Sequence, residues 1–265
     1  MNEVINVISN RMSLRKYKDE KISKEHLDII IEAAMRAPTA GNMMMYSVII
    51  VEDEEKKKKL SKTCDDQPFI AKAPTVLIFL ADMQRWYDYF DYSNVKDYCE
   101  RNNKKYAGPG EGDFVLAIED TMIAAQNAVI AAESLGIGSC YIGDIIENYE
   151  IHKEMFNLPK WVVPVGMLCM GYYPGNYNRI IQPRFDRKYI VFNEEYNRLK
   201  AEDFEYMFKD KKVAKENIYK AENFGQYMYG RKIGSDFSKE MTRSIKVMLE
   251  NWKEKWFSNL ILIFN

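Results

Sequence analysis

Residues 113–143 read DFVLAIEDTMIAAQNAVIAAESLGIGSCYIG. Asp113 can cap a helix over Phe114–Leu135, in which six alanines present small side chains. Such a helix packs closely against more than one neighbour, so we predict that it lies at the centre of the fold. Glycines interrupt the helical pattern from Gly136, and the apolar residues after them predict a strand over Ser139–Ile142.

Three further segments, on both sides of this stretch, have the composition of strands. Ser47–Glu52 is rich in β-branched residues, and Val163–Tyr172 is bounded by prolines. Thr75–Ala81 is almost wholly apolar, which is typical of a strand buried on both faces. We also predict an edge strand at Lys188–Phe192, added to the sheet of this chain or to that of a partner subunit. Further helices are predicted at Asn2–Asn10, Ser23–Arg36 and Glu54–Lys62.

Composition excludes several classes of protein. The chain has 265 residues, of which 47% are hydrophobic and 13% aromatic, and this is enough apolar mass for a packed core. Its 38 basic and 39 acidic residues give a net charge of −1. We therefore expect no nucleic-acid partner and no binding to an anionic membrane, since both require a basic excess. No segment reaches the roughly 20 uninterrupted apolar residues of a membrane span.

Cysteine and histidine are sparse. The four cysteines form no CxxC pair, and the two histidines belong to no HExxH motif, so we expect neither a disulfide framework nor a metal site. Scattered free thiols and the lack of a signal-peptide pattern favour the cytoplasm. Cys140 is expected to be a small buried side chain, and the alternative is a redox role. His26 and His152 lie on predicted helices, and we expect them at the surface or in cap regions.

The chain changes character after residue 193. Residues 194–265 offer few strand signals and predict helices at Glu194–Phe208, Val213–Asn223 and Asp236–Phe257. We interpret 194–265 as a helical C-terminal extension, packed on the main domain or on a partner subunit. Its aromatic stretch Phe224–Tyr229 suits either packing or the edge of a lid over a substrate.

A basic stretch near the N-terminus, Arg11-x-Ser13-x-Arg15, can direct two guanidiniums and a hydroxyl at one phosphate. Taken alone, it is more simply a basic surface turn. Its place in an ordered set of motifs changes the interpretation. That set comprises Arg11–Tyr17, Ala37–Asn42, Asp120–Leu135, Gly136–Gly143, Val163–Tyr172 and finally Gln182-Pro183-Arg184.

Over residues 5–193 this ordered set resembles the FMN-dependent nitroreductase family. The resemblance implies an α+β fold, a three-layer sandwich with a mainly antiparallel central sheet. It also implies a homodimer that binds FMN at its interface, takes hydride from NADH or NADPH, and reduces a nitroaromatic, a quinone or a related small-molecule acceptor by a ping-pong route. The alternatives are another reaction on the same fold (dehalogenation, flavin cleavage or heterocycle oxidation) or a flavin-binding protein without turnover.

The resemblance also implies roles for particular residues. Arg11 and Ser13 would hold the FMN phosphate and ribityl chain with Met12 beside them, and Arg184 would reach the same phosphate. Arg15 would lie at the N1–C2=O edge of the ring and Gln67 at its pyrimidine edge. The main chain of Ile142 and Gly143 would face N5, so no catalytic side chain is expected. The partner subunit would contribute a segment that includes Pro38, Thr39, Ala40 and Asn42.

Two positions depart from the family pattern. Met43-Met44-Met45-Tyr46 stands where the family commonly has SQPW, and flexible thioethers there would reshape the pocket wall. Gln182 stands where many members have a second basic residue, so binding of the phosphate would depend more heavily on Arg11 and Arg184.

Overall fold

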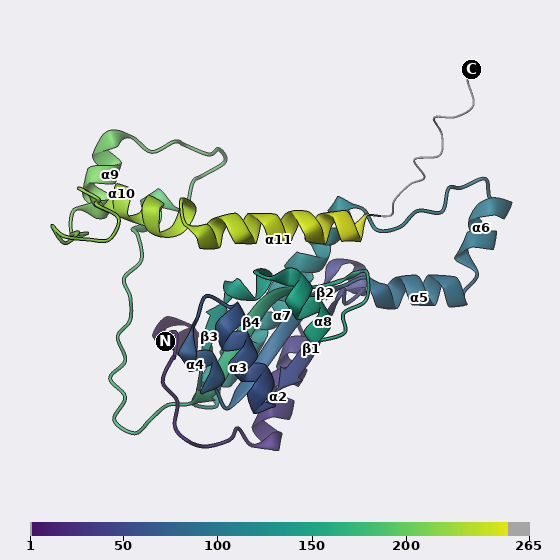
Figure 1. The fold of residues 1–265 in the computed structure, drawn as a ribbon, viewed down its shortest axis with the longest axis horizontal. Helices are drawn as coiled ribbons and strands as arrows, with labels where there is room; N and C mark the ends of the chain where they lie inside the picture. Colours follow the sequence, from purple (N-terminus) through teal and green to yellow (C-terminus); the bar gives the residue numbers. More distant parts are fainter. Residues whose placement is uncertain (1, 254–265) are drawn as a thin grey trace. The chain divides into compact units, whose positions relative to one another are not determined.

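The computed structural model describes residues 2–253 (Figure 1). Two compact units are distinguished. The first comprises residues 1–179 together with 241–265, and the second comprises 180–240. In the sequence, the second unit therefore lies between the two segments that form the first.

A four-stranded sheet forms the middle of the first unit, in the order β1-β2-β4-β3. Every neighbouring pair is antiparallel, and the sequence prediction of a mainly antiparallel sheet is confirmed. The register places Ile49 opposite Ile78 and Cys140 opposite Cys169. The strands are β1 (Tyr46–Val51), β2 (Thr75–Asp82), β3 (Ile137–Ile142) and β4 (Val162–Tyr172).

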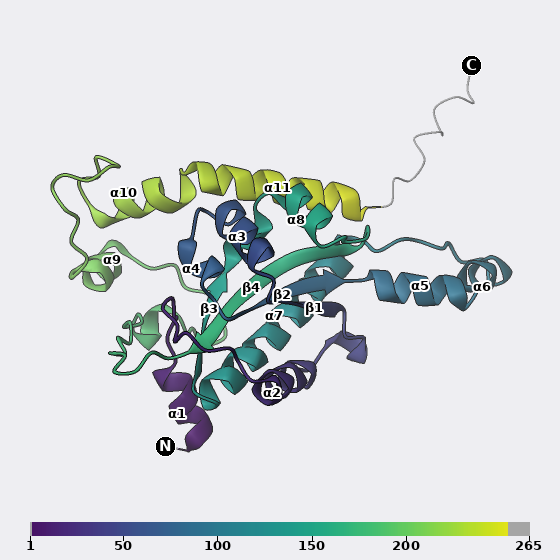
Figure 2. The same ribbon diagram turned by 60° about the horizontal axis from the view of Figure 1, so that its bottom comes forward.

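Helices cover both faces of this sheet, and α5 and α6 extend away from it (Figure 2). The helices of this unit are α1 (Glu3–Asn10), α2 (Lys24–Met35), α3 (Glu54–Thr63), α4 (Pro68–Ala71), α5 (Gln84–Tyr92), α6 (Val95–Arg101), α7 (Glu111–Ser134) and α8 (Tyr149–Met155), with short 3-10 turns η1 (Ala40–Asn42) and η2 (Gly143–Ile146). Because side chains alternate along a strand, Ile78 faces α3 and α4, whereas Phe79 faces α2 and α7. The result is the predicted three-layer α+β sandwich.

Helix α7 is the central helix that the alanines predicted. It begins at Glu111, because the Asp113 carboxylate accepts a hydrogen bond from the Gly110 N–H at 2.8 Å. Ala125, Ala128 and Ala132 are fully buried against the sheet and α2. Among the described residues only α7 has the length and apolar composition of a membrane span, a test that buried core helices also pass.

The C-terminal helix α11 (Asp236–Trp252) begins in the second unit and continues into the first. Its Met248 and Trp252 are buried in a cluster with Phe114, whose ring centroid lies 4.9 Å from that of Trp252. Trp161 Nε1 donates to the Trp252 carbonyl oxygen at 2.8 Å. Residues 241–252 are therefore part of the core of the first unit. The rest of the predicted helix Asp236–Phe257, beyond residue 253, lies outside the described residues.

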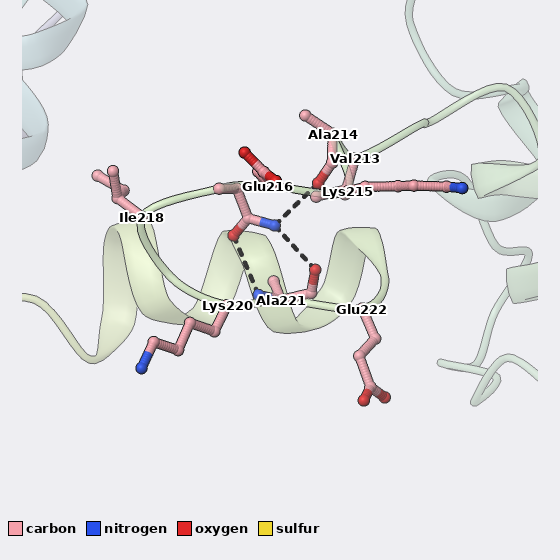
Figure 3. Close-up of a pocket in the computed structure, with 9 residues that line it drawn as sticks. Val213, Ala214, Lys215, Glu216, Ile218, Lys220, Ala221 and Glu222 are labelled. Atoms are coloured by element: carbon pink, nitrogen blue, oxygen red, sulfur yellow. Dashed lines mark hydrogen bonds between the residues drawn. The ribbon is translucent and has the colours of Figure 1, made fainter.

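The second unit contains η3 (Arg187–Tyr189), α9 (Ala201–Phe208), α10 (Phe224–Met228) and a short π-helical turn, η4 (Tyr229–Ile233). The predicted helix Val213–Asn223 is wrong. Asn217 donates from Nδ2 to the Ala214 and Ala221 carbonyls, and its Oδ1 accepts from Ala221 N–H at 3.0 Å (Figure 3). An asparagine that bonds its own backbone in this way stabilises a loop at the expense of a helix.

The predicted edge strand at Lys188–Phe192 is also wrong within this chain. The backbone forms the 3-10 turn η3, in which Tyr189 N–H donates to the Asp186 carbonyl and Ile190 N–H to the Arg187 carbonyl, both at 3.0 Å. These local hydrogen bonds use backbone groups that a strand would direct toward a neighbouring strand.

His152 is not at the surface, contrary to the sequence prediction. It is fully buried on α8, where Nδ1 lies 2.9 Å from the Ile145 carbonyl oxygen and Nε2 lies 2.8 Å from Thr63 Oγ1. Because a carbonyl only accepts, Nδ1 carries the proton and Nε2 accepts from the threonine. Burial lowers the pKa of His152 to about 4. The neutral ring joins η2 to the end of α3.

We expect the stability of the protein to fall as the pH drops from about 6.5 to about 4. Below pH 6.5 the unfolded chain protonates His152 while the folded chain does not, so protons favour unfolding by up to about 3 kcal/mol. Urea unfolding of wild type and His152→Asn at pH 7.5, 5.5 and 4.5 measures this effect. The variant should show a shallower decline with pH, and equal slopes for the two proteins would contradict the assignment.

Candidate functional site

The basic stretch after α1 lies alongside β3. Ser13 forms an isolated parallel bridge with Ser139, and Leu14 N–H donates to the Ser139 carbonyl at 2.9 Å. Leu14 is fully buried, and a Cβ added at Gly138 would lie 2.8 Å from Leu14 Cβ, so only glycine leaves room for this close approach. Alternation then directs the side chains of Ser13 and Arg15 to the side opposite Leu14.

Arg11, Ser13 and Arg15 all influence the pKa of one buried thiol, that of Cys140. Burial raises the pKa of Cys140, and the guanidiniums of Arg15 and Arg11 and a hydrogen bond with Ser13 partly oppose that rise. The expectation that Cys140 is a small buried side chain is confirmed, since it is 2% exposed. Arg15 also lies over the Phe69 ring, 5.7 Å from its centroid. In the described part of the chain, neither arginine forms an ion pair with a carboxylate.

Gln67 and the turn after β3 meet beyond Arg15. The Gln67 amide nitrogen donates to Asp144 Oδ2 and to the Cys64 carbonyl, both at 3.0 Å. Asp144 follows Gly143, whose main chain is exposed. We call the line of Arg11, Met12, Ser13, Arg15, Gln67, Ile142 and Gly143 the β3 strip; the structure brings these predicted residues together along one strand and the turn that follows it.

The segment Pro38–Asn42 is held elsewhere. Ala40 N–H donates to Asp120 Oδ1 at 2.9 Å, and Met45 N–H donates to Asp120 Oδ2 at 3.3 Å. Asp120 is buried on α7, so its carboxylate holds both ends of the turn. Asn42 is exposed, with a left-handed φ of 57°. Among the described residues, and apart from its own sequence neighbours, the segment is hydrogen-bonded to α7 and not to the β3 strip.

Arg184 belongs to the second unit. It is exposed, and its guanidinium donates to the Gln182 carbonyl at 3.2 Å. It lines a cleft of about 520 Å³ with Tyr206 and Lys209. A larger cavity of about 800 Å³ in the same unit surrounds the loop held by Asn217, and no predicted site residue lines it (Figure 3).

Sequence reasoning missed a polar clamp at the start of the β3 strip. Arg179 donates to Glu133 Oε1 at 2.6 Å and to the Asn10 carbonyl at 3.5 Å, and Tyr173 OH donates to Glu133 Oε2 at 2.8 Å. The clamp fixes the end of α1, directly before Arg11. These residues are far apart in the chain, and no local pattern relates them.

Met241 is a second residue that the sequence did not place at the site. It lies on the part of α11 that belongs to the first unit, and a Cβ added at Gly143 would be 3.8 Å from its Cε. An apolar side chain of the C-terminal helix thus borders the turn after β3. Within the described residues, no three His, Cys, Asp or Glu side chains are grouped so as to hold a metal ion.

The sequence is similar to that of proteins of known family. The model of the nitroreductase family matches residues 8–172. A Bacillus subtilis protein named FMN reductase [NAD(P)H] is 35% identical over 74% of this chain and 75% of its own length. Another from the same species, FMN reductase (NADPH), is 28% identical over 78% of this chain and 79% of its own.

A solved structure shows the same fold over almost the whole chain. The Bacillus megaterium protein NfrA2 is 30% identical, with a TM-score of 0.74, over 97% of this chain and all of its own. The overall fold is thus shared with this solved structure. The chain belongs to the nitroreductase family.

Proposed function

We propose that the protein is an FMN-dependent oxidoreductase that takes hydride from NADH or NADPH and reduces a nitroaromatic, a quinone or a related small acceptor. Similarity to two proteins named FMN reductase supports this activity. The observation that carries the proposal is the β3 strip. Arg11 and Arg15 form no ion pair with a carboxylate in the described chain. Both lie on the stretch that runs alongside β3, and the turn after β3 exposes the main chain of Gly143.

The residues of the strip suit the parts of FMN in order. Arg11, Ser13 and Met12 would hold the phosphate and ribityl chain, with Arg184 as a further phosphate ligand. Arg15, kept over Phe69, would stabilise the negative charge that reduction places at the N1–C2=O edge. The main chain of Ile142 and Gly143 would face N5. When bound, FMN supplies the hydride-transfer chemistry, which explains why no catalytic side chain is needed.

A homodimer completes the proposed site. Pro38, Thr39, Ala40 and Asn42 form a turn that Asp120 holds on α7, with Pro38 and Asn42 exposed and Thr39 and Ala40 half-buried, and such a turn is suited to the partner's cofactor. Exposed apolar side chains offer surface for the interface. They include Val4, Ile5 and Ile8 on α1 and Val115, Leu116 and Ile123 on α7.

The two parts of the chain would divide the work. Residues 1–193 would bind FMN, and the extension 194–265 would influence the choice of acceptor, which the contact between Met241 and the Gly143 turn supports. The four free cysteines suit a reducing compartment, so we place the enzyme in the cytoplasm.

The purified protein should carry flavin absorbance that NADH or NADPH bleaches under anaerobic conditions, and a quinone or nitroaromatic should restore it. Anaerobic spectra measure each half-reaction separately, with oxidised NAD(P)⁺ as the control that leaves the bands unchanged. Protein that neither contains nor takes up FMN would contradict the proposal, and bound flavin that is never bleached would leave only a binding protein.

Arg11→Ala should weaken FMN binding by about 10-fold to 150-fold, because it removes a charge-assisted hydrogen bond to the phosphate. Binding is measured by quenching of flavin fluorescence on the apoprotein. Riboflavin, which lacks the phosphate, should bind the variant as it binds the wild type. Lys16→Ala is the matched control, an exposed cation of the same stretch that should change neither affinity. An equal loss for riboflavin would refute the phosphate role.

The dimer should have a mass of about 62 kDa, twice that of the 31.1 kDa chain. Co-refolding Arg11→Ala with Asn42→Ala chains should regain tight FMN sites that neither variant has alone, since one site of the mixed dimer is intact. Co-refolding Arg11→Ala with Arg15→Ala chains should regain no tight site. Each site takes both arginines from the same chain, so each site of this mixed dimer lacks one of them. If light scattering shows a stable monomer and this monomer still binds FMN, the shared site is overturned.

A further inference from the structure

Gln67 is fixed at its backbone and at its amide nitrogen. Its N–H donates to the Ser61 carbonyl at 2.8 Å, and its carbonyl accepts from Ile70 N–H at 3.1 Å at the start of α4. The side-chain amide nitrogen donates twice, to the Cys64 carbonyl and to Asp144 Oδ2. Both amide protons are therefore in use.

The two partners also decide which way the amide faces. A backbone carbonyl and a carboxylate can only accept, so rotating the amide by half a turn would oppose Oε1 to two acceptors and lose both hydrogen bonds. Asp144 supplies the stronger, charge-assisted bond of the two. In the described chain Oε1 has no partner, and this acceptor is the one polar atom of the side chain left for a ligand.

We infer that Asp144 is a positioning residue that fixes Gln67 as a hydrogen-bond acceptor, so that the pyrimidine edge of the flavin is recognised at its N3–H. This inference rests on the proposed FMN site. The edge presents the acceptors C2=O and C4=O on either side of one donor, N3–H. An amide whose only unused atom is an acceptor complements the donor and neither carbonyl.

The consequence is a specific form of ligand discrimination. N3-methyl-FMN keeps the phosphate, the ribityl chain and both carbonyls but lacks the N3–H. The wild-type apoprotein should bind it more weakly than FMN by at least about threefold to tenfold, the factor expected for one neutral hydrogen bond. If the protein instead recognised the two carbonyls of the flavin edge, loss of the N3–H would remove no hydrogen bond.

Fluorescence titrations give the ratio of the Kd of N3-methyl-FMN to that of FMN for each variant. Gln67→Ala removes the acceptor and should lower the ratio by about threefold to tenfold. Asp144→Ala removes the stronger of the two hydrogen bonds that fix the amide and leaves only the Cys64 carbonyl, so it should lower the ratio by more than about twofold. Asp144→Asn retains an acceptor oxygen and should keep the ratio within about twofold of wild type. Asp66→Asn, which removes the exposed partner of Lys62 next to Gln67, is the matched control and should leave the ratio unchanged.

The outcomes separate this inference from the proposed function. Tight FMN binding with the same ratio in wild type and Asp144→Ala overturns the inference alone, because a merely steric rejection of the methyl group does not depend on Asp144. A wild-type ratio near one also overturns it. If the wild type binds no flavin, the proposed function fails, and the inference fails with it. Should Asp144→Ala fail to fold by circular dichroism, Gln67→Ala must still lose the discrimination.

Discussion

The pairing of Leu14 with Ser139 is the constraint on which the site depends. One backbone hydrogen bond of 2.9 Å, with the buried Leu14 side chain behind it, joins the N-terminal stretch to β3 in parallel. Because the pairing is parallel, each step from Arg11 toward Arg15 advances in the same direction as β3 toward Gly143. A slip of one residue would turn the arginines inward and Leu14 outward. The order of the strip is thus set by a single register.

Buried polar side chains hold the loops around that register. Asp120 holds the Pro38–Asn42 turn on α7, Glu133 with Arg179 holds the end of α1, and His152 holds η2 against α3. Each group accepts or donates where an irregular backbone would otherwise bury unsatisfied atoms, which is costly inside a protein. The same groups make the loops rigid, and a rigid loop presents its main chain to a ligand without a loss of entropy on binding.

The C-terminal helix contributes both to the core of the first unit and to the border of the turn after β3. Residues 241–252 of α11 complete the core of the first unit through Met248 and Trp252, and Met241 of the same helix borders the turn after β3. The intervening residues 180–240 form a unit of their own, whose loop around Asn217 is fixed by local hydrogen bonds. Amphipathic spacing in α11 is therefore a property of the first unit's core, although the helix lies far from it in sequence.

Local patterns in the sequence determined the four strands, the central alanine-rich helix and the basic stretch, because period and capping act over a few residues. Motif order indicated the family, and the comparisons confirm it. Only the tertiary structure decided that His152 is buried, that residues 213–223 form a loop, and that Asp144 meets Gln67. Long-range contacts bury His152 and join Asp144 to Gln67, and Asn217 bonds its own backbone where a helix was predicted. None of these interactions leaves a periodic signal in the sequence.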